Sequence, residues 1–168
     1  KEKFDGVMLD IEPYISDSWK ENPEEYMDRY ISCMKKGYKF AQKNHLRTAI
    51  CIPRHYDNQG LTSGLEELIK ETCDEVAVMN YSCGNEIEAI RTEAALSEKY
   101  GKELHCILEF QEVGKHGLTE NKTYRNKGID NAKETWEKLQ KEYKNINVTR
   151  DYHWSRPVRE MLEEKNAD

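Results

Sequence analysis

The segment that decides the fold is Phe4-Asp5-Gly6-Val7-Met8-Leu9-Asp10-Ile11-Glu12-Pro13-Tyr14. Its apolar run is typical of a buried strand, and the run ends in two carboxylates separated by one residue. Successive side chains of a strand point to opposite faces of the sheet. We therefore expect residues 7, 9 and 11 to pack beneath helices, whereas Met8, Asp10 and Glu12 lie together on the other face.

The pattern of this segment recurs along the chain as a short apolar run, a polar loop and an amphipathic stretch. Strands are expected over residues 4–12, 48–53, 75–81, 104–111 and 146–152. Helices are expected from Pro23, from near Ser63, and over 85–100, 129–143 and 155–162. Strict alternation of helices with strands rich in Val, Ile and Leu favours an α/β fold with a parallel sheet. No Pro- or Ser-rich linker interrupts the pattern, so residues 1–168 are expected to form a single domain.

Two of the helix starts have caps that can be recognised in the sequence. Asn22 precedes Pro23 and two acidic residues, which is typical of a helix N-terminus. Ser63 and Glu66 have the spacing of a capping box. Gly101 follows the third helical stretch and is expected to end it, because glycine readily adopts the left-handed conformation.

The composition restricts the class of protein and its partners. The 168 residues are 37% hydrophobic and 35% charged, which is typical of a folded domain rather than a disordered chain. With 26 Lys and Arg against 32 Asp and Glu, the net charge of −6 disfavours nucleic acid and anionic membranes as partners. No apolar run approaches the roughly 18 residues of a membrane span.

The cysteines indicate neither a disulfide framework nor a metal site. They are odd in number and no pair has Cys-x-x-Cys spacing: Cys33, Cys51, Cys73, Cys83 and Cys106. We expect reduced thiols, and neither a metal nor another cofactor. The chain begins at Lys1, a few residues before an apolar run, so we expect it to belong to a longer protein.

Polar residues gather where the expected strands end, which is where parallel α/β folds carry their chemistry. Asp10 and Glu12 end the first strand. Two neighbouring carboxylates can keep one of them protonated near neutral pH, as a general acid requires. Structural hydrogen bonds are an equally good explanation of the same pair.

Two later strands end in residues of similar character. Tyr81, preceded by Asn80, ends the third strand, where its phenol could contact a ligand or fill the core. Glu109 and Gln111 end the fourth strand, and a carboxylate within an apolar strand requires a salt bridge or a catalytic role.

The fifth expected strand ends in the polar and aromatic cluster Arg150-Asp151-Tyr152-His153-Trp154. Aromatic faces pack well on the apolar faces of pyranose rings. Tyr152 and Trp154 are therefore expected to contact a carbohydrate, and a loop that caps the sheet is the alternative.

These residues resemble the motifs of glycoside hydrolase family 18, the chitinase-like enzymes. That family carries Asp-x-x-Asp-x-Asp-x-Glu on one barrel strand, and the same frame holds Asp5, Met8, Asp10 and Glu12. The family also has Met-x-Tyr at a later strand end, matched by residues 79–81, and an aromatic residue at the last strand, matched by Trp154. The three motifs occur here in the family's order.

The resemblance implies a (β/α)8 barrel, a TIM barrel, of which residues 1–168 supply the C-terminal five βα units with parallel strands. A complete barrel takes roughly 200–250 residues, so the first three βα units would be missing. The open sheet edges of such a unit could then mediate self-association.

The resemblance also implies roles for individual residues. Glu12 would be the general acid that protonates the leaving oxygen of a glycan containing N-acetylamino sugars. Asp10 would orient the acetamido group as an internal nucleophile, and Tyr81 would hydrogen-bond that group. Further contacts to the carbohydrate are expected from Tyr14, Asn80, Glu109, Gln111, Tyr152 and Trp154.

Three alternatives stay open. Met8 replaces the family's second Asp, which favours a catalytically impaired, lectin-like barrel that binds carbohydrate. A retaining glycosidase would use Glu12 as acid/base and Glu109 as nucleophile, with the carboxyl groups about 5–5.5 Å apart. An unrelated doubly wound domain would need a Gly-rich phosphate loop, and the sequence contains none. We favour the family 18 arrangement because it gives Asp10 and Tyr81 a role.

Overall fold

The computed structural model describes residues 3–165 and contains one sheet of five parallel strands. The strands are β1 (Gly6–Asp10), β2 (Arg47–Pro53), β3 (Glu75–Met79), β4 (Glu103–Glu109) and β5 (Val148–His153). They lie beside one another in the order of the sequence, β1-β2-β3-β4-β5. The prediction of an α/β fold with a parallel sheet is confirmed.

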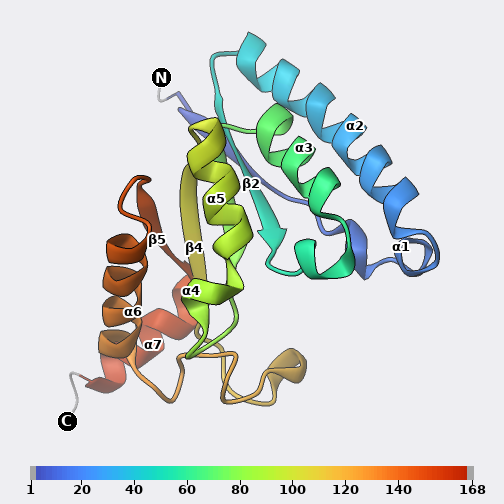
Figure 1. Cartoon of the computed structure of the whole chain (residues 1–168). Helices are drawn as coiled ribbons and strands as arrows, with labels where there is room; N and C mark the ends of the chain where they lie inside the picture. Colours follow the sequence, from blue (N-terminus) through green and yellow to red (C-terminus); the bar gives the residue numbers. More distant parts are fainter. Residues whose placement is uncertain (1–2, 166–168) are drawn as a thin grey trace.

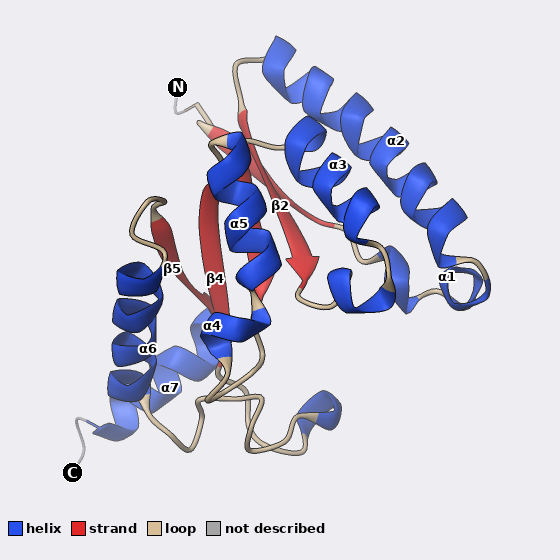
Figure 2. Ribbon diagram, in the orientation of Figure 1, coloured by secondary structure: helices blue, strands red, loops and turns tan. Residues whose placement is uncertain are grey.

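Helices connect consecutive strands and follow the last one. In residues 3–165 they are α1 (Asp17–Glu21), α2 (Pro23–Lys43), α3 (Thr62–Thr72), α4 (Glu86–Ala89), α5 (Arg91–Tyr100), α6 (Ile129–Glu142) and α7 (Ser155–Lys165). Figures 1 and 2 show α2, α3, α5 and α6 following one another across the same face of the sheet. None of the helices described is both long and apolar enough to cross a membrane.

The main hydrophobic core fills the space between the sheet and these helices. Met27 of α2, Leu65 of α3 and Trp136 of α6 pack there with strand residues such as Ile50 and Leu104. Full burial of one such side chain contributes about 1.5–3 kcal/mol. The opposite face of the sheet has a much smaller apolar cluster of Cys51, Ala77 and Ile107, with Met79 and Tyr81 packed against it.

This arrangement excludes the doubly wound alternative. A doubly wound sheet reverses its strand order at a switch point and has helices on both faces. Across residues 3–165 the strand order runs without reversal, and the main core lies on one face.

The first strand is less buried than its sequence predicts. Met8 is 49% exposed and Ile11 is 42% exposed, and Asp10 is exposed as well. The reason is that β1 forms an edge of the sheet, with β2 as its one partner in the part of the chain described. The prediction of a buried strand is wrong for β1.

The predicted helix caps are confirmed in one case and wrong in the other. The side chain of Asn22 accepts a hydrogen bond from the N–H of Glu25, and Pro23 is the first residue of α2. The helix α3 begins before Ser63, with Leu61 at the cap position, so the expected capping box does not form.

Two helical segments differ from the predicted boundaries. The helix expected over 85–100 divides at Ile90 into α4 and α5, and Gly101 ends α5 in the left-handed conformation as predicted. The helix α1 is not predicted, because five residues are too few to show a helical repeat of apolar positions.

Candidate functional site

A cavity of about 1060 Å³ lies on the face of the sheet opposite the main core. Every strand contributes to its wall at or just beyond its carboxyl end. The wall includes Met8, Asp10, Glu12, Tyr14, Cys51, Arg54, His55, Met79, Tyr81, Ile107, Glu109, Gln111, Asp151, His153 and Trp154. Binding sites for small ligands commonly measure about 300–1,000 Å³, and this cavity is slightly larger than that.

Asp10 and Glu12 both line the cavity, as the alternation along the first strand predicts. The hydroxyl of Tyr14 donates a hydrogen bond to Oε1 of Glu12. Burial raises the pKa of Tyr14, and the bond to Glu12 raises it further, so the phenol remains protonated. The ring of His55 lies edge-on to Tyr14 with the ring centroids 5.2 Å apart. Tyr14 therefore holds the carboxyl group of Glu12 in a defined position.

A thiol lies beside Asp10. Cys51 is the register partner of Asp10 on β2 and is buried in the cavity wall. Burial raises the pKa of the Cys51 thiol to about 12, and the charge of Asp10 and a hydrogen bond to it contribute further. The thiol is therefore a neutral neighbour of the Asp10 carboxylate.

Tyr81 lines the same cavity from the residues that follow β3. Burial raises its pKa, and the carboxylate of Glu109 raises it further, so the phenol is a neutral donor. Its ring centroid lies 6.1 Å from that of His153. Within residues 3–165 the hydroxyl has no hydrogen-bond partner, so it is available to a ligand.

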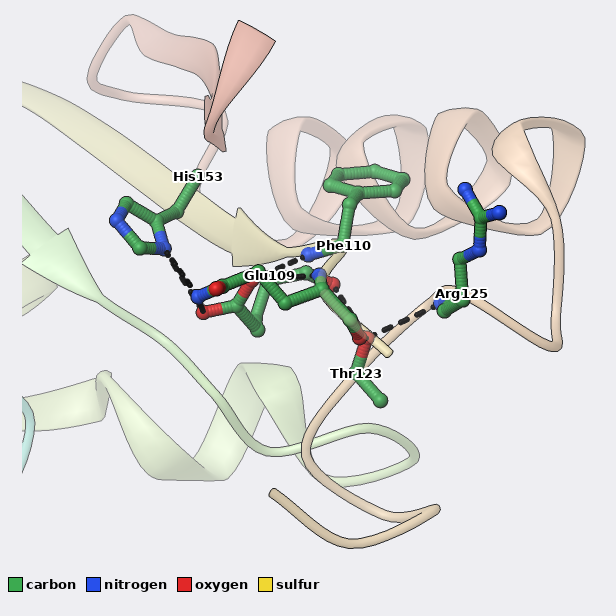
Figure 3. A network of polar contacts seen from close by, with 6 residues as sticks. Glu109, Phe110, Thr123, Arg125 and His153 are labelled. Atoms are coloured by element: carbon green, nitrogen blue, oxygen red, sulfur yellow. Dashed lines mark hydrogen bonds and ion pairs between the residues drawn. The ribbon is translucent and has the colours of Figure 1, made fainter. Parts of the chain in front are cut away.

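Glu109 is the most buried carboxylate in the cavity wall, with 2% of the residue exposed. Its Oε1 accepts hydrogen bonds from the backbone N–H groups of Phe110 at 2.8 Å and Gln111 at 2.7 Å. Its Oε2 lies 2.8 Å from Nδ1 of His153 and 3.3 Å from Nε2 of Gln111. Figure 3 shows the ring of His153 and the backbone nitrogen of Phe110 directed at this carboxylate. The four donors occupy the four lone-pair positions of the group.

This hydrogen bonding favours the charged forms of both Glu109 and His153. Burial alone would raise the pKa of Glu109, but hydrogen bonds from His153 and Gln111 outweigh it, and the pKa lies below its ordinary value. The bond to Glu109 in turn raises the pKa of His153. A carboxylate so fully occupied is poorly suited to attack a sugar, which disfavours the retaining arrangement with Glu109 as nucleophile.

Asn80 is directed away from the cavity. It is 1% exposed, and its Nδ2 donates hydrogen bonds to the carbonyl of Glu86 at 2.9 Å and to Sγ of Cys106 at 3.5 Å. The reason is the alternation of side chains, which puts Asn80 on the helix-covered face when Met79 and Tyr81 face the cavity. The prediction that Asn80 contacts a ligand is wrong.

At the end of β5 the inward-facing residues are Asp151 and His153, which pair in register with residues of β4 that also line the cavity. Tyr152 points to the other face and packs edge-on against Phe110, with centroids 6.4 Å apart. Tyr152 therefore lies at the edge of the cavity and does not point into it. Its predicted contact with a carbohydrate is not supported. Trp154 lines the cavity and is 44% exposed.

Several basic residues of the wall were not expected from the sequence: Arg54, His55, His116 and Lys122. Arg54 and His55 directly follow β2, so the rule that chemistry lies beyond strand ends would have found them. His116 and Lys122 belong to the irregular segment between β4 and α6, where no periodic pattern indicates which residues approach the sheet.

A second polar cluster lies at the other end of the strands. His105 makes hydrogen bonds of 2.8 Å with Asp151 through Nδ1 and with Glu75 through Nε2. The bond to Asp151 is the largest cause of a raised pKa of His105. Ligand atoms of Glu75, Glu103 and His105 lie close enough to hold a metal, but Arg47 forms ion pairs with both glutamates. The cluster is therefore satisfied as an ion-pair network.

A comparison of the chain with protein-family models, with curated proteins and with solved structures gives no match in any of the three. What the chain does is therefore inferred from the cavity itself.

Proposed function

We propose that these five βα units form part of a (β/α)8 barrel of glycoside hydrolase type, and that the cavity binds a glycan. The observation that carries the proposal is that Asp10, Glu12 and Tyr81 line one cavity at the carboxyl ends of parallel strands. The strand order without reversal and the helices on one face are what a stretch of barrel wall requires.

In this proposal Glu12 is the general acid. Its carboxyl proton passes to the glycosidic oxygen as the bond to the anomeric carbon breaks. The hydrogen bond from Tyr14 fixes the direction from which that proton is delivered. Asp10 orients the 2-acetamido group, whose oxygen attacks the anomeric carbon, and the free hydroxyl of Tyr81 donates to the same group. Water then opens the cyclic intermediate and returns a proton to Glu12.

A second candidate is a carbohydrate-binding barrel without catalysis, and Met8 favours it. Met8 lines the cavity on the same face as Asp10 and supplies no carboxylate there. The aromatic surface of Trp154 and the hydroxyl of Tyr81 could bind a sugar in either case.

The test is hydrolysis of aryl glycosides of N-acetylglucosamine oligomers, together with other aryl glycosides. Glu12→Gln is expected to lower turnover, by up to about 10²–10⁴-fold for the substrates with the poorest leaving groups, the usual contribution of a general acid. Glu21→Gln, an exposed acid on α1, is the matched control and should leave turnover unchanged. If the wild type binds glycan but does not hydrolyse it, the second candidate is correct. If Glu12→Gln leaves turnover unchanged, Glu12 is not the general acid.

A further inference from the structure

We propose that the ligand of this cavity is an acidic glycan, and that Arg54 and Lys122 bind its anionic groups. The inference rests on the proposed function, because it names the class of sugar that the same cavity takes. It is carried by the distribution of partnered and unpartnered charges around the cavity.

Two of the carboxylates in the cavity wall are already neutralised. Glu109 bonds to His153, as described above, and Asp151 bonds to Nδ1 of His105 at 2.8 Å. Both histidines have raised pKa values because of these hydrogen bonds to carboxylates. The negative charge that remains in the wall lies on β1 and its extension, where Asp10 and Glu12 are assigned to the reacting bond.

Two basic side chains of the wall, by contrast, form no ion pair within residues 3–165. Arg54 and Lys122 make no side-chain hydrogen bond or ion pair to any residue in that range, and the charge of Arg54 acts on the buried carboxyl of Glu93 only at longer range. Most arginines of this acidic chain do pair with a carboxylate: Arg29, Arg47, Arg91, Arg125 and Arg156. Since the chain has an excess of acids, an unpaired arginine and lysine on one cavity point to an anion supplied from outside.

Both basic residues stand on backbone that the fold holds in position. Thr123, next to Lys122, is 1% exposed and donates a hydrogen bond of 2.6 Å to the carbonyl of Gln111. The next N–H, that of Tyr124, donates to the carbonyl of Glu109 at 2.8 Å. Figure 3 shows this segment returning alongside Glu109. Lys122 therefore lies on an anchored turn rather than on a free loop.

Arg54 is anchored in a similar way. It lies between Pro53, the last residue of β2, and Tyr56, which is completely buried against Trp19. Burial and the charge of Arg54 lower the pKa of His55, so that imidazole stays neutral and its ring remains against Tyr14. Arg54 therefore lies on the same segment as His55, which packs against Tyr14, the hydrogen-bond partner of Glu12.

The chemistry of the two cations fits a sugar acid. A guanidinium binds carboxylate or sulfate with two parallel hydrogen bonds, and a lysine adds a compact point charge. A neutral glycan would leave both cations unpaired in the bound state. A uronic acid or a sulfated sugar adjoining an N-acetylamino sugar would satisfy them while the reacting bond lies at Glu12.

The experiment compares the affinities of the wild-type chain for a hyaluronan tetrasaccharide and for its fully methyl-esterified, uncharged form by calorimetry. The acid is expected to bind at least about tenfold more tightly, the usual gain from a hydrogen bond to a charged group. Arg54→Gln and Lys122→Gln should each reduce that preference. Lys36→Gln, which changes an exposed lysine of α2 that has no ion pair among residues 3–165, should retain it. A chondroitin 6-sulfate tetrasaccharide assigns the cations to a sulfate if it binds more tightly still, and to the carboxylate if it does not.

Equal affinities of the acid and its ester, or a preference unchanged in both variants, would overturn the inference and leave the proposed function intact. Absence of binding by either tetrasaccharide would also overturn it. The hydrolysis of neutral aryl glycosides, with and without Glu12→Gln, tests the proposed function separately. Should a variant not fold, the comparison of acid and ester on the wild-type chain is decisive by itself.

Discussion

His153 and Glu109 form an ion pair that joins the ends of β5 and β4, with Nδ1 of His153 2.8 Å from Oε2 of Glu109. The two residues are register partners, so the parallel pairing of the strands itself brings them together. The pair fixes the part of the cavity wall against which Tyr81 lies.

The ion pair predicts a pH dependence of stability. The lowered pKa of Glu109 contributes stability above its unfolded pKa, and this is lost as the pH falls through the lower folded value. The raised pKa of His153 contributes stability below its unfolded pKa, and this is lost as the pH rises through the higher folded value. The pair should therefore stabilise most between the ordinary pKa values of Glu and His, roughly pH 4.5 to 6.5.

Glu109→Gln should lower the free energy of unfolding on the order of 2 kcal/mol near pH 5.5, and by less at pH 9. Urea denaturation across this pH range measures the difference. Glu112→Gln, which removes an exposed pair with Lys115, is the control and should cause no comparable loss. A cost of Glu109→Gln that is the same at both pH values would contradict the charged pair.

Glu93 predicts a loss of folding stability as the pH rises towards neutrality. It is completely buried in α5, neither carboxylate oxygen has a partner within residues 3–165, and burial raises its pKa to about 7. Because the folded pKa is raised, its stabilising contribution is complete below the unfolded pKa and is lost as the pH rises through about 7.

The wild type should therefore lose on the order of 1–3 kcal/mol of stability between pH 5 and pH 8. Glu93→Gln should not show this loss. Thermal unfolding at the two pH values measures it. Glu98→Gln changes an exposed acid of the same helix and should keep the wild-type difference. An identical pH response in Glu93→Gln and the wild type would contradict a protonated Glu93.

The free hydroxyl of Tyr81 predicts a loss of binding without a loss of stability. Tyr81→Phe should weaken glycan binding by about three- to tenfold, the usual value of one hydrogen bond, because no protein group replaces that donor. The melting temperature should change little, because the hydroxyl has no partner in the described chain. Tyr26→Phe on α2 is the control. Unchanged affinity in Tyr81→Phe would place its phenol outside the binding site.

The exposed edge of β1 predicts concentration-dependent self-association. Phe4 is 88% exposed just before this strand, and β1 has one strand partner in residues 3–165. Sedimentation velocity should show association that Phe4→Lys reduces, since a charge beside an open edge opposes strand pairing. Phe40→Lys changes an equally apolar residue that is 69% exposed on α2 and should not reduce it. A monomer at all concentrations would be evidence against the edge as an interface.

Features with a local cause could be predicted from the sequence. The five strands, the cap of α2 at Asn22 and the common face of Asp10 and Glu12 all follow from spacing within a few residues. The same alternation, applied strictly, would also have removed Asn80 from the list of ligand contacts.

Features that depend on segments far apart in the chain could not be predicted from the sequence. The exposure of β1 depends on which strand lies beside it, and the pairing of Glu109 with His153 depends on the register between β4 and β5. Lys122 reaches the cavity because Thr123 is hydrogen-bonded to Gln111, just beyond β4, a contact between residues 12 apart that leaves no periodic signal.

The role of Glu12 as proton donor is tested most directly by varying the leaving group. Glu12→Gln should lower hydrolysis of an alkyl glycoside by about 10²–10⁴-fold, because its leaving oxygen must be protonated. A glycosyl fluoride needs much less acid assistance, so the same variant should retain most of the rate of fluoride release in a single turnover, the step that precedes proton return from water to Glu12. Equal losses on the two substrates, or no loss on the alkyl glycoside, would contradict the assignment of Glu12 as the general acid.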